Sequence, residues 1–438
     1  MRPASTGISS RSNTFFINLI ASGTLPLPQS ATEIIKSMDT QEIAERFAEE
    51  SHPDVLQEFD RASLEELVEK HETPFMVLDL SEVDFQYKSL QAALPGVKLF
   101  YALKSLSHPE LVKRLKSLGC HFDLATSGEV ELVESLGIRG DQCIHTHPIK
   151  KDKEIRRALQ FGCNRFVIDN MEELKKFFPY AGQAELIIRV SFRSKQAVVD
   201  LSRKFGCSLE ELPQLVETAQ QNGLTVIGLS FHVGSQSLTP MTQANAVRSS
   251  IAAMKVMNNV HWKILDIGGS FPVSYQEQVL PIADFCAPVM EALSEVPEGV
   301  EVYAEPGRFI SGPSMIELVS VVGKAKRGAR TWYYLDDGVY GGFSGQIFDH
   351  AIYPLAPLKP FDPTGEFFPS VLAGPTCDSI DVVAENIELP DLEVGDILVG
   401  KKMGAYTIAS ATEFNFYPKP KVVVVEDIFD PDTVETEA

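Results

Sequence analysis

The sequence predicts an α/β protein in which a (β/α)8, TIM-like barrel is followed by a C-terminal β-rich domain of β-barrel or sandwich type. With 438 residues, the chain exceeds the roughly 100–200 residues of a typical domain, which indicates more than one domain. Eight short runs rich in β-branched and aromatic residues end in a polar residue or glycine, and helical stretches separate them. Beyond Gly312 the helical periodicity fades and strand-like segments dominate, so the two patterns predict two different domains.

The eight runs have the spacing that a barrel of parallel strands requires. Their ends follow one another at intervals of 21 to 43 residues, which leaves room for a crossover helix each time. Eight such strand–helix units close into a barrel of roughly 250 residues. The predicted barrel strands are Leu99–Lys104, Phe122–Thr126, Cys143–His147, Arg165–Asp169, Leu186–Val190, Ile227–Val233, Ile264–Gly268 and Val302–Glu305.

The chain after the barrel predicts a second core built from strands. We place the barrel in residues 74–311 and the β domain in residues 312–426. Phe75–Leu80 precedes the barrel strands but is a candidate further strand of the β domain. The other strands predicted for this domain are Trp332–Leu335, Ser370–Ala373, Asp396–Val399, Ala405–Ala409 and Val422–Val425.

The two ends of the chain differ in composition from these domains. Residues 1–40 are rich in Ser and Thr and predict a disordered leader, and the apolar run Phe15–Ala21 leaves a cleaved targeting segment as the alternative. Residues 41–73 form an acidic lead-in whose apolar spacing predicts two amphipathic helices. Residues 427–438 form an acidic tail that we expect to be disordered.

Composition argues against several classes of partner. A formal net charge of −21 argues against binding to nucleic acid or to an anionic membrane, both of which need clustered cations. Much of this charge lies in the acidic lead-in and tail, so it indicates little about chemistry. No apolar run approaches the ~20 residues of a membrane-spanning helix. The six cysteines include no CxxC pair, which indicates reduced thiols and a cytoplasmic compartment.

Chemically useful side chains gather where the predicted barrel strands end, which is where such barrels have their active sites. Lys104 ends an apolar strand, so we expect desolvation to lower the pKa of its ammonium group and favour imine formation. The turns Gly234-Ser235 and Gly268-Gly269-Ser270 have backbone N–H groups that can hold a phosphate. The other residues of this ring are Asp123, Glu129, His147, Asp169, Arg189, His232, Glu305 and Arg308.

A lysine, a phosphate cradle and a carboxylate together suit pyridoxal 5'-phosphate (PLP). The lysine forms an imine with this cofactor, the loops hold its phosphate, and the carboxylate keeps its ring nitrogen protonated so that the ring accepts electrons. A metal site is the alternative for His145 and His147, which alternate on one predicted strand. Because no third ligand lies near them in the sequence, we assign no residue to a metal.

Nine ordered blocks of sequence support this hypothesis together, although each is weak alone. They are Phe100–Lys104, Phe122–Thr126, Leu201–Gly206, Ser230–Ser235, Leu265–Gly269, Ala304–Arg308, Asp337–Gly341, Gly374–Asp378 and Gly404–Thr407. In these blocks the chain resembles the fold-type III PLP-dependent ornithine/lysine decarboxylases, the eukaryotic-type ornithine decarboxylase group. The resemblance covers roughly residues 73–420.

The resemblance implies a role for each matching residue. Lys104 would carry the cofactor as an imine, His232 would stack on its ring, and Cys377 would return a proton to Cα after carbon dioxide leaves. In this family the Cys377 and Asp378 positions reach in from the second subunit, which implies a homodimer with shared active sites. The residues implied to hold the cofactor or support its site are Ser235, Gly269, Glu305, Arg308, Tyr406, Asp123, Glu129 and Arg189.

The resemblance also implies that Asp337 and Asp378 bind the distal ammonium of a basic amino acid. Two carboxylates favour such a substrate over a neutral or acidic one. Meso-diaminopimelate decarboxylases usually have Cys-Glu-Ser where this chain has Cys377-Asp378-Ser379. The segment therefore favours decarboxylation of L-ornithine to putrescine, of L-lysine to cadaverine, or both, in polyamine biosynthesis. Arginine and diaminopimelate stay open as other substrates.

Three positions depart from the family pattern. Leu106 stands where the family usually has Asn, Ser270 replaces the third glycine of the phosphate loop, and His147 stands where Asn is common. These departures keep a second class of function open, a non-catalytic regulator of the antizyme-inhibitor type. Asp336 is an alternative substrate contact beside Asp337, although the motif match favours Asp337.

Overall fold

The structure, a computed structural model, describes residues 59–192, 204–275, 278–362, 365–426 and 428. The leader predicted for residues 1–40 and the first helix predicted in the acidic lead-in lie outside the described residues, as does the predicted tail apart from residue 428. The second predicted helix of the lead-in is confirmed as α4 (Arg61–Lys70), whose N-cap residue Asp60 accepts a hydrogen bond from the backbone N–H of Ala62.

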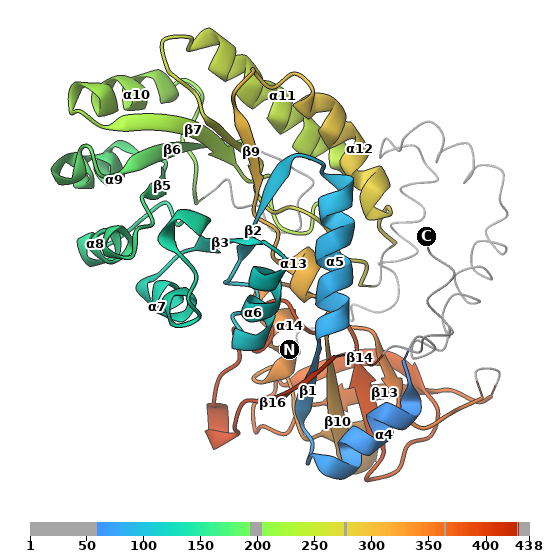
Figure 1. The fold of residues 1–438 in the computed structure, drawn as a ribbon. Helices are drawn as coiled ribbons and strands as arrows, with labels where there is room; N and C mark the ends of the chain where they lie inside the picture. Colours follow the sequence, from blue (N-terminus) through green and yellow to red (C-terminus); the bar gives the residue numbers. More distant parts are fainter. Residues whose placement is uncertain (1–58, 193–203, 276–277, 363–364, 427, 429–438) are drawn as a thin grey trace, which may run out of the picture. The chain divides into compact units, whose positions relative to one another are not determined.

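Eight parallel strands close into a barrel in sequence order, with β2 pairing with β9 (Figure 1). All eight predicted runs are confirmed as strands, with bounds that differ by a few residues. The barrel strands are β2 (Val97–Ala102), β3 (His121–Leu124), β4 (Cys143–His145), β5 (Arg165–Ile168), β6 (Glu185–Val190), β7 (Thr225–Phe231), β8 (Ile264–Asp266) and β9 (Glu301–Ala304).

The barrel is filled by side chains and is covered by helices on its outside. A helix follows each of its strands, as a right-handed parallel crossover requires. The helices are α6 (Pro109–Ser117), α7 (Ser127–Ser135), α8 (Asp152–Phe161), α9 (Met171–Lys176), α10 (Leu212–Gln221), α11 (Pro240–Val256), α12 (Ile282–Leu293) and α13 (Arg308–Ser311). The interior cluster takes one residue from each of seven strands: Phe100, Ile144, Val167, Ile187, Ile227, Ile264 and Tyr303.

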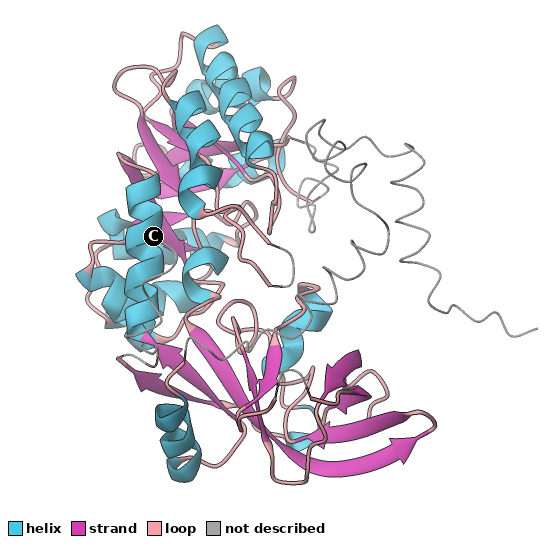
Figure 2. Cartoon of the chain, turned by 90° about the vertical axis from the view of Figure 1, so that its right-hand side faces the viewer, coloured by secondary structure: helices cyan, strands magenta, loops and turns pink. Residues whose placement is uncertain are grey.

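The remaining strands form a second, mostly antiparallel sheet (Figure 2). Its strand order is β12-β15-β10-β11-β13-β14, and β1 pairs with both β10 and β16. Four of the strands predicted after the barrel are confirmed in this sheet, and so is Phe75–Leu80, which corresponds to β1. The strands are β1 (Phe75–Asp79), β10 (Met315–Arg327), β11 (Arg330–Leu335), β12 (Leu355–Pro357), β13 (Phe368–Ala373), β14 (Val382–Leu389), β15 (Ile397–Gly400) and β16 (Lys421–Val425).

The structure corrects the sequence prediction at two places in this sheet. Because β1 belongs to the sheet, the barrel does not begin at residue 74, and its strands begin at Val97 after helix α5 (Leu80–Ala93). The strand predicted at Ala405–Ala409 is wrong, since this segment forms turns. Its Tyr406 has φ +57° and donates its backbone N–H to the carbonyl of Ser105, 3.0 Å away, so the turns reach the barrel beside Lys104. Strands β10, β12 and β14 were not predicted.

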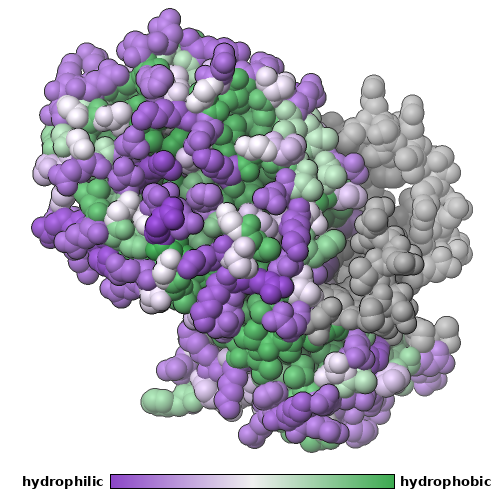
Figure 3. Space-filling view, in the orientation of Figure 1, coloured by the Kyte–Doolittle hydropathy of each residue, from purple (hydrophilic) through white to green (hydrophobic). Residues whose placement is uncertain are grey.

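The surface in Figure 3 is mostly hydrophilic, with hydrophobic areas between. Several large apolar side chains of the segment that carries the second sheet are exposed, among them Phe348 (63%), Ile380 (52%) and Phe416 (98%). In the described part of the chain, no helix combines the length and the apolar character needed to cross a membrane.

Candidate active site

Lys104 and Asp123 form an ion pair at the carboxyl ends of β2 and β3. Lys104 Nζ lies 2.6 Å from Asp123 Oδ2, and the hydroxyl of Thr146 donates to the other carboxylate oxygen. The Lys104 side chain is 44% exposed, whereas that of Asp123 is 1% exposed. Desolvation lowers the pKa of Lys104, but Asp123 and Glu305 outweigh it, so the pKa is raised overall. The predicted lowering is therefore wrong for the side chain in this environment, because the charge of nearby carboxylates dominates over desolvation.

A buried pair of carboxyl groups lies at the ends of β8 and β9. Asp266 accepts a hydrogen bond from the backbone N–H of Gly268 at 2.9 Å, and its other carboxylate oxygen has no donor in the described chain. Burial raises the pKa of both Asp266 and Glu305, and each carboxyl group acts on the other. Two anions this close in a buried site are unfavourable, so the pair holds a proton more readily than an exposed carboxylate does. Glu305 can therefore exchange a proton with a basic ring nitrogen.

His232 is a neutral imidazole at the end of β7. Its Nδ1 accepts the backbone N–H of Gly234 at 3.0 Å, and Ser270 Oγ lies 3.5 Å from the same atom. Burial lowers the pKa of His232 to about 3, and the positive charges of Arg189 and Lys104 act in the same direction. An uncharged planar ring at this position suits stacking on an aromatic cofactor. Arg189 itself, from β6, is desolvated, which lowers the pKa of its guanidinium.

Arg308 is the centre of a buried cationic site at the first residue of α13. Its Nη1 donates to Tyr275 at 3.0 Å, and its Nη2 donates to Ser235 Oγ at 3.0 Å and forms an ion pair with Asp349. The guanidinium carbon lies 5.0 Å from the ring centroid of Tyr406. Arg308 is 4% exposed, and its Nε has no partner among the described residues. Ser235, Arg308 and Tyr406 are thus brought together as predicted, with one buried donor left available.

The loops after β8 and β9 approach each other closely at Gly269. A Cβ at this position would lie 1.8 Å from the carbonyl oxygen of Glu305, so no larger residue fits without a shift of backbone. The preceding Gly268 has φ +70°, and Gly234 in the neighbouring turn has φ +112°. Glycine at these positions lets both turns present backbone to the space beside Arg308, as a phosphate cradle requires.

The residues at this end of the barrel fit PLP. A buried guanidinium with a free donor and a neighbouring hydroxyl suits its phosphate. A buried carboxyl group that holds a proton suits its ring nitrogen, and the partly exposed Lys104 suits its aldehyde. Lys104 follows β2, whereas Glu305 and Arg308 both follow β9, so all three groups lie at the same end of the barrel.

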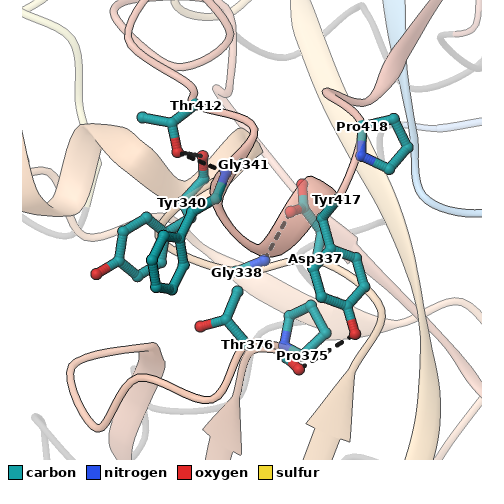
Figure 4. A pocket seen from close by; sticks show the side chains of 10 residues that line it. Asp337, Gly338, Tyr340, Gly341, Pro375, Thr376, Thr412, Tyr417 and Pro418 are labelled. Carbon is teal, nitrogen blue, oxygen red and sulfur yellow. Dashed lines mark hydrogen bonds between the residues drawn. The ribbon is translucent and has the colours of Figure 1, made fainter.

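Of the two predicted substrate residues, Asp337 lines a small pocket formed by loops next to the second sheet, whereas Asp378 does not line it (Figure 4). Asp337 is 6% exposed and accepts the backbone N–H groups of Gly338 and Gly342, each at 2.8 Å. The hydroxyl of Tyr340 donates to Asp378 Oδ2, and the ring of Tyr340 stacks on Phe414 with centroids 4.4 Å apart. The pocket is lined by Asp337, Gly338, Tyr340, Gly341, Pro375, Thr376, Thr412, Phe414, Tyr417 and Pro418.

The neighbouring Asp336 is engaged elsewhere. Its Oδ1 accepts the backbone N–H of Ser320 at 2.8 Å, and its Oδ2 accepts hydroxyl groups of Ser320 and Thr73 at 2.6 Å each. Asp336 does not line the pocket, whereas Asp337 does. The geometry therefore favours Asp337 over Asp336 as a substrate contact.

The predicted site residues fall into two groups in this single chain. Lys104, Asp123, Glu305, His232 and Arg308 lie around the barrel end, and Asp337 and Asp378 lie in the loops that follow β11 and β13 of the second sheet. Cys377 is exposed, and its Sγ lies 3.4 Å from Asn415 Oδ1. Among the described residues, no hydrogen bond or ion pair joins Cys377 or Asp378 to the barrel group.

The three departures from the family pattern have different surroundings. Leu106 is buried and accepts the hydroxyl of Tyr101 on its backbone carbonyl at 2.9 Å, so its side chain packs in the core. Ser270 lies beside His232, as described above. His147 accepts the backbone N–H of Ile149 at 3.0 Å, and its ring lies against Phe205. Ser270 and His147 thus have local structural contacts.

Of three further predicted residues, Glu129 and Asp169 have hydrogen-bond partners, whereas His145 has none among the described residues. Glu129 completes a capping box at the start of α7, where its carboxylate accepts the backbone N–H groups of Ala125 and Thr126. Asp169 accepts the backbone N–H of Gly206 at 2.8 Å. His145 is fully buried with neither ring nitrogen paired, and the described residues contain no group of three metal-ligating side chains.

Sequence reasoning missed four residues that contact the predicted site. Asp349 and Tyr275 bind Arg308, Tyr340 binds Asp378, and Glu317 of β10 lies beside Asp337. Tyr340 was within a recognised block, Asp337–Gly341, so that block was a signal for it. The other three come from segments with no motif, and only the folded chain brings them to the site.

Comparisons with known proteins agree with this geometry. Residues 80–312 match the family described as pyridoxal-dependent decarboxylase, pyridoxal binding domain. Two crystal structures of lysine/ornithine decarboxylase from Vibrio vulnificus, complexed with putrescine and with cadaverine, are 50% and 49% identical. Both have a TM-score of 0.79, and they cover 84% and 83% of this chain and 98% and 96% of theirs.

Two further relatives have different functions in their names. Lysine/ornithine decarboxylase of Selenomonas ruminantium is 35% identical over 364 residues, which is 82% of this chain and 91% of the relative. Antizyme inhibitor 2 of Xenopus laevis is 34% identical over 365 residues, 80% of each chain. Overall similarity of sequence therefore extends to both an enzyme and a protein named as an inhibitor.

Proposed function

The chain belongs to the pyridoxal-dependent decarboxylases related to ornithine and lysine decarboxylase, and we propose that it decarboxylates L-ornithine, L-lysine or both. The observation that carries this proposal is a matched pair of features. A lysine paired with a buried carboxylate lies at the barrel end, and Asp337 lines a pocket in which two backbone N–H groups donate to it and no described lysine or arginine pairs with it. The first feature suits PLP, and the second suits a substrate with a terminal ammonium.

The residues of the chain have separate tasks in this proposal. PLP, when bound, supplies an electron sink for the bond that loses carbon dioxide. Lys104 holds the cofactor covalently, and Glu305 holds a proton at its ring nitrogen. His232, neutral at physiological pH, packs against the ring. The residues that bind the phosphate are Ser235, Gly269, Arg308 and Tyr406, and Asp123 and Arg189 set the charge around Lys104 and Glu305.

Substrate binding and the final proton transfer use the second sheet. Asp337 and Asp378 bind the distal ammonium, and Cys377 delivers a proton to Cα. Ornithine and lysine differ by one methylene, which changes binding by only ~1–3 kcal/mol. We therefore propose that one pocket accepts both amino acids at different rates, to give putrescine and cadaverine for polyamine biosynthesis.

We propose further that the working unit is a homodimer whose two chains share each active site. Within the described part of one chain, Cys377 and Asp378 have no hydrogen bond to the barrel group, and exposed apolar side chains such as Phe348 and Phe416 provide a surface for association. Mixing Lys104→Ala chains, which we expect to be inactive, with Cys377→Ala chains, which we expect to be slow, tests this proposal. Mixed dimers would contain one intact site, so activity should return after subunit exchange. If the subunits exchange and the activity of the mixture does not rise above that of the separate variants, the proposal of a shared site is wrong.

The division of the chain follows from these tasks. We propose that residues 80–311 hold the cofactor and that residues 312–426, with β1, complete the site for the substrate.

All six cysteines are free thiols, and five of them are buried. This supports our proposal that the protein works in a reducing, cytoplasmic compartment.

Carbon dioxide release tests the proposed function directly. We expect purified, PLP-loaded protein to release carbon dioxide from ornithine, lysine or both, faster than from arginine or diaminopimelate. The similarity to antizyme inhibitor 2 makes a non-catalytic regulator the alternative. A protein that binds PLP through Lys104 but releases no carbon dioxide from any of the four amino acids would contradict the enzyme and favour the regulator.

A further inference from the structure

Glu317 of β10 is a buried acid next to the proposed substrate carboxylate Asp337. Its side chain is 0% exposed, and neither carboxylate oxygen accepts a hydrogen bond from an N–H or O–H group of the described residues. No lysine or arginine in the described part of the chain forms an ion pair with it. An unpaired anion in such a place is very unfavourable. Glu317 therefore needs either a proton or a partner.

The backbone around η4 (Gly342–Ser344) is shaped to admit both carboxyl groups. A Cβ at Gly342 would lie 2.2 Å from each carboxylate oxygen of Glu317, and a Cβ at Gly341 would lie 1.8 Å from Asp337 Oδ1. The two acids thus occupy the spaces that two consecutive glycines leave open. This arrangement places Glu317 within hydrogen-bond reach of Asp337.

The hydrogen bonds around the pair decide which acid carries the proton. Asp337 accepts two backbone N–H groups, from Gly338 and Gly342, which stabilise its anion. Glu317 accepts none. Burial and the charge of Asp337 raise the pKa of Glu317 well above its usual value. Burial also raises the pKa of Asp337, but the hydrogen bond from Glu317 lowers it.

We propose that Glu317 is a positioning residue, whose protonated carboxyl group donates to Asp337 and holds Asp337 as the anion that binds the substrate ammonium. This inference rests on the proposed function, because that function supplies the substrate ammonium that Asp337 would bind. It adds a residue that has no motif in the sequence. The donated hydrogen bond leaves lone pairs of Asp337 free on the pocket side, where the ammonium can donate.

The other groups facing Glu317 do not supply a competing cation. Asp336 acts on it as a second negative charge, and Tyr353 is a buried neutral hydroxyl that interacts with it. The strand neighbours in register are Met76 of β1 and Gly400 of β15, which do not titrate. Lys401 follows Gly400, but its Nζ lies 5.4 Å from the ring centroid of Phe59.

Two substitutions separate the proton donor from the shape of the side chain. Glu317→Gln keeps an N–H donor for Asp337, whereas Glu317→Leu fills a similar volume with no donor. In PLP-loaded enzyme, we expect Glu317→Gln to keep KM for lysine and ornithine within about twofold of wild type. We expect Glu317→Leu to raise KM by about tenfold or more, with kcat changed much less, since a hydrogen bond to a charged group is lost.

The pH profile gives a readout that a purely structural role would not move. Without the donor the pKa of Asp337 rises, so Asp337 is protonated at a higher pH. The acidic limb of kcat/KM should therefore move to higher pH in Glu317→Leu and stay in place in Glu317→Gln. An active Glu317→Leu enzyme with wild-type KM and an unmoved acidic limb would overturn the inference while leaving the proposed function intact.

Infrared spectroscopy tests the proton without any catalysis. The difference spectrum between wild type and Glu317→Gln at neutral pH should contain the carbonyl band of a protonated carboxylic acid. A carboxylate band in its place would overturn the inference, even if Glu317→Leu does not fold. Wild-type protein that releases no carbon dioxide from any basic amino acid would instead overturn the proposed function, and with it the substrate role of this pair.

Discussion

Buried charges have different partners at the barrel end and in the pocket next to the second sheet. At the barrel end Lys104 is paired with Asp123 and Arg308 with Asp349, while the carboxyl groups of Asp266 and Glu305 lie next to each other. In the second sheet, Asp337 accepts only backbone N–H groups and the proposed hydrogen bond from Glu317. No ion pair in the described chain supplies it with a cation.

This difference indicates what each region binds. A buried ion is tolerated when it is paired, so the barrel end is prepared to hold a cofactor with both an anionic phosphate and a basic nitrogen. An anion that lacks a cation in its own chain is prepared for one from outside. The comparison therefore explains why the two regions together suit a basic amino acid.

Removing the cation of the barrel should have the largest effect. We expect Lys104→Ala to abolish carbon dioxide release, because it removes the group that we propose to hold the cofactor covalently. The visible absorbance of the bound cofactor should change as well. Lys98→Ala is the control, since Lys98 lies on β2, the strand that leads to Lys104, in an exposed ion pair with Glu301 that contributes little. Turnover by Lys104→Ala comparable to that of Lys98→Ala would exclude Lys104 from the chemistry.

Removing Cys377, the proposed proton donor in the loop after β13, should have the second-largest effect. We expect Cys377→Ala to lower turnover by roughly 10²-fold or to divert it to transamination, since a positioned acid contributes about that much. Measuring carbon dioxide and diamine in the same reaction separates slow turnover from diversion. Cys286→Ala, which changes a thiol buried in α12, controls for loss of a cysteine as such. An unchanged rate and product ratio in Cys377→Ala would count against its role.

Neutralising the unpaired carboxylate should weaken substrate binding. We expect Asp337→Asn to raise KM for lysine and ornithine by about 10- to 100-fold, the range for a lost hydrogen bond to a charged group. Asp336→Asn is the matched control, because Asp336 binds Ser320 and Thr73 and does not line the pocket. If Asp336→Asn raises KM as much as Asp337→Asn does, the assignment of Asp337 is wrong.

A smaller effect is expected from the hydroxyl that binds Asp378. The hydrogen bond from Tyr340 lowers the pKa of Asp378, so Tyr340→Phe should return that pKa toward its usual value. Asp378 would then be protonated at a higher pH, so on acidification substrate binding would begin to weaken at a higher pH in Tyr340→Phe than in wild type. Near neutral pH both proteins keep Asp378 ionised, so KM should differ only a few-fold. Measuring KM against pH, with Tyr334→Phe as control, checks this, and superimposable acidic limbs would contradict it.

The sequence predicted the barrel strands well because each strand can be recognised from residues that are close together in the sequence. Each barrel strand is a short apolar run, and residues that end such runs, such as Lys104 and Glu305, must meet at one end of the barrel. Contacts between distant segments left no such pattern. Asp349 beside Arg308 and Glu317 beside Asp337 depend on packing, and the pKa of Lys104 depends on its distance to Asp123, which the sequence does not contain. Ala405–Ala409 shows the converse error, where an apolar run forms turns against the barrel.

The ratio of kcat/KM for lysine and norleucine tests the central claim most directly, because these amino acids differ only in the terminal ammonium. Asp337 should make the wild-type enzyme prefer lysine strongly, and Asp337→Asn should lose most of that preference. A wild-type enzyme that uses norleucine as well as lysine, or an Asp337→Asn enzyme that keeps the wild-type ratio, would contradict the account.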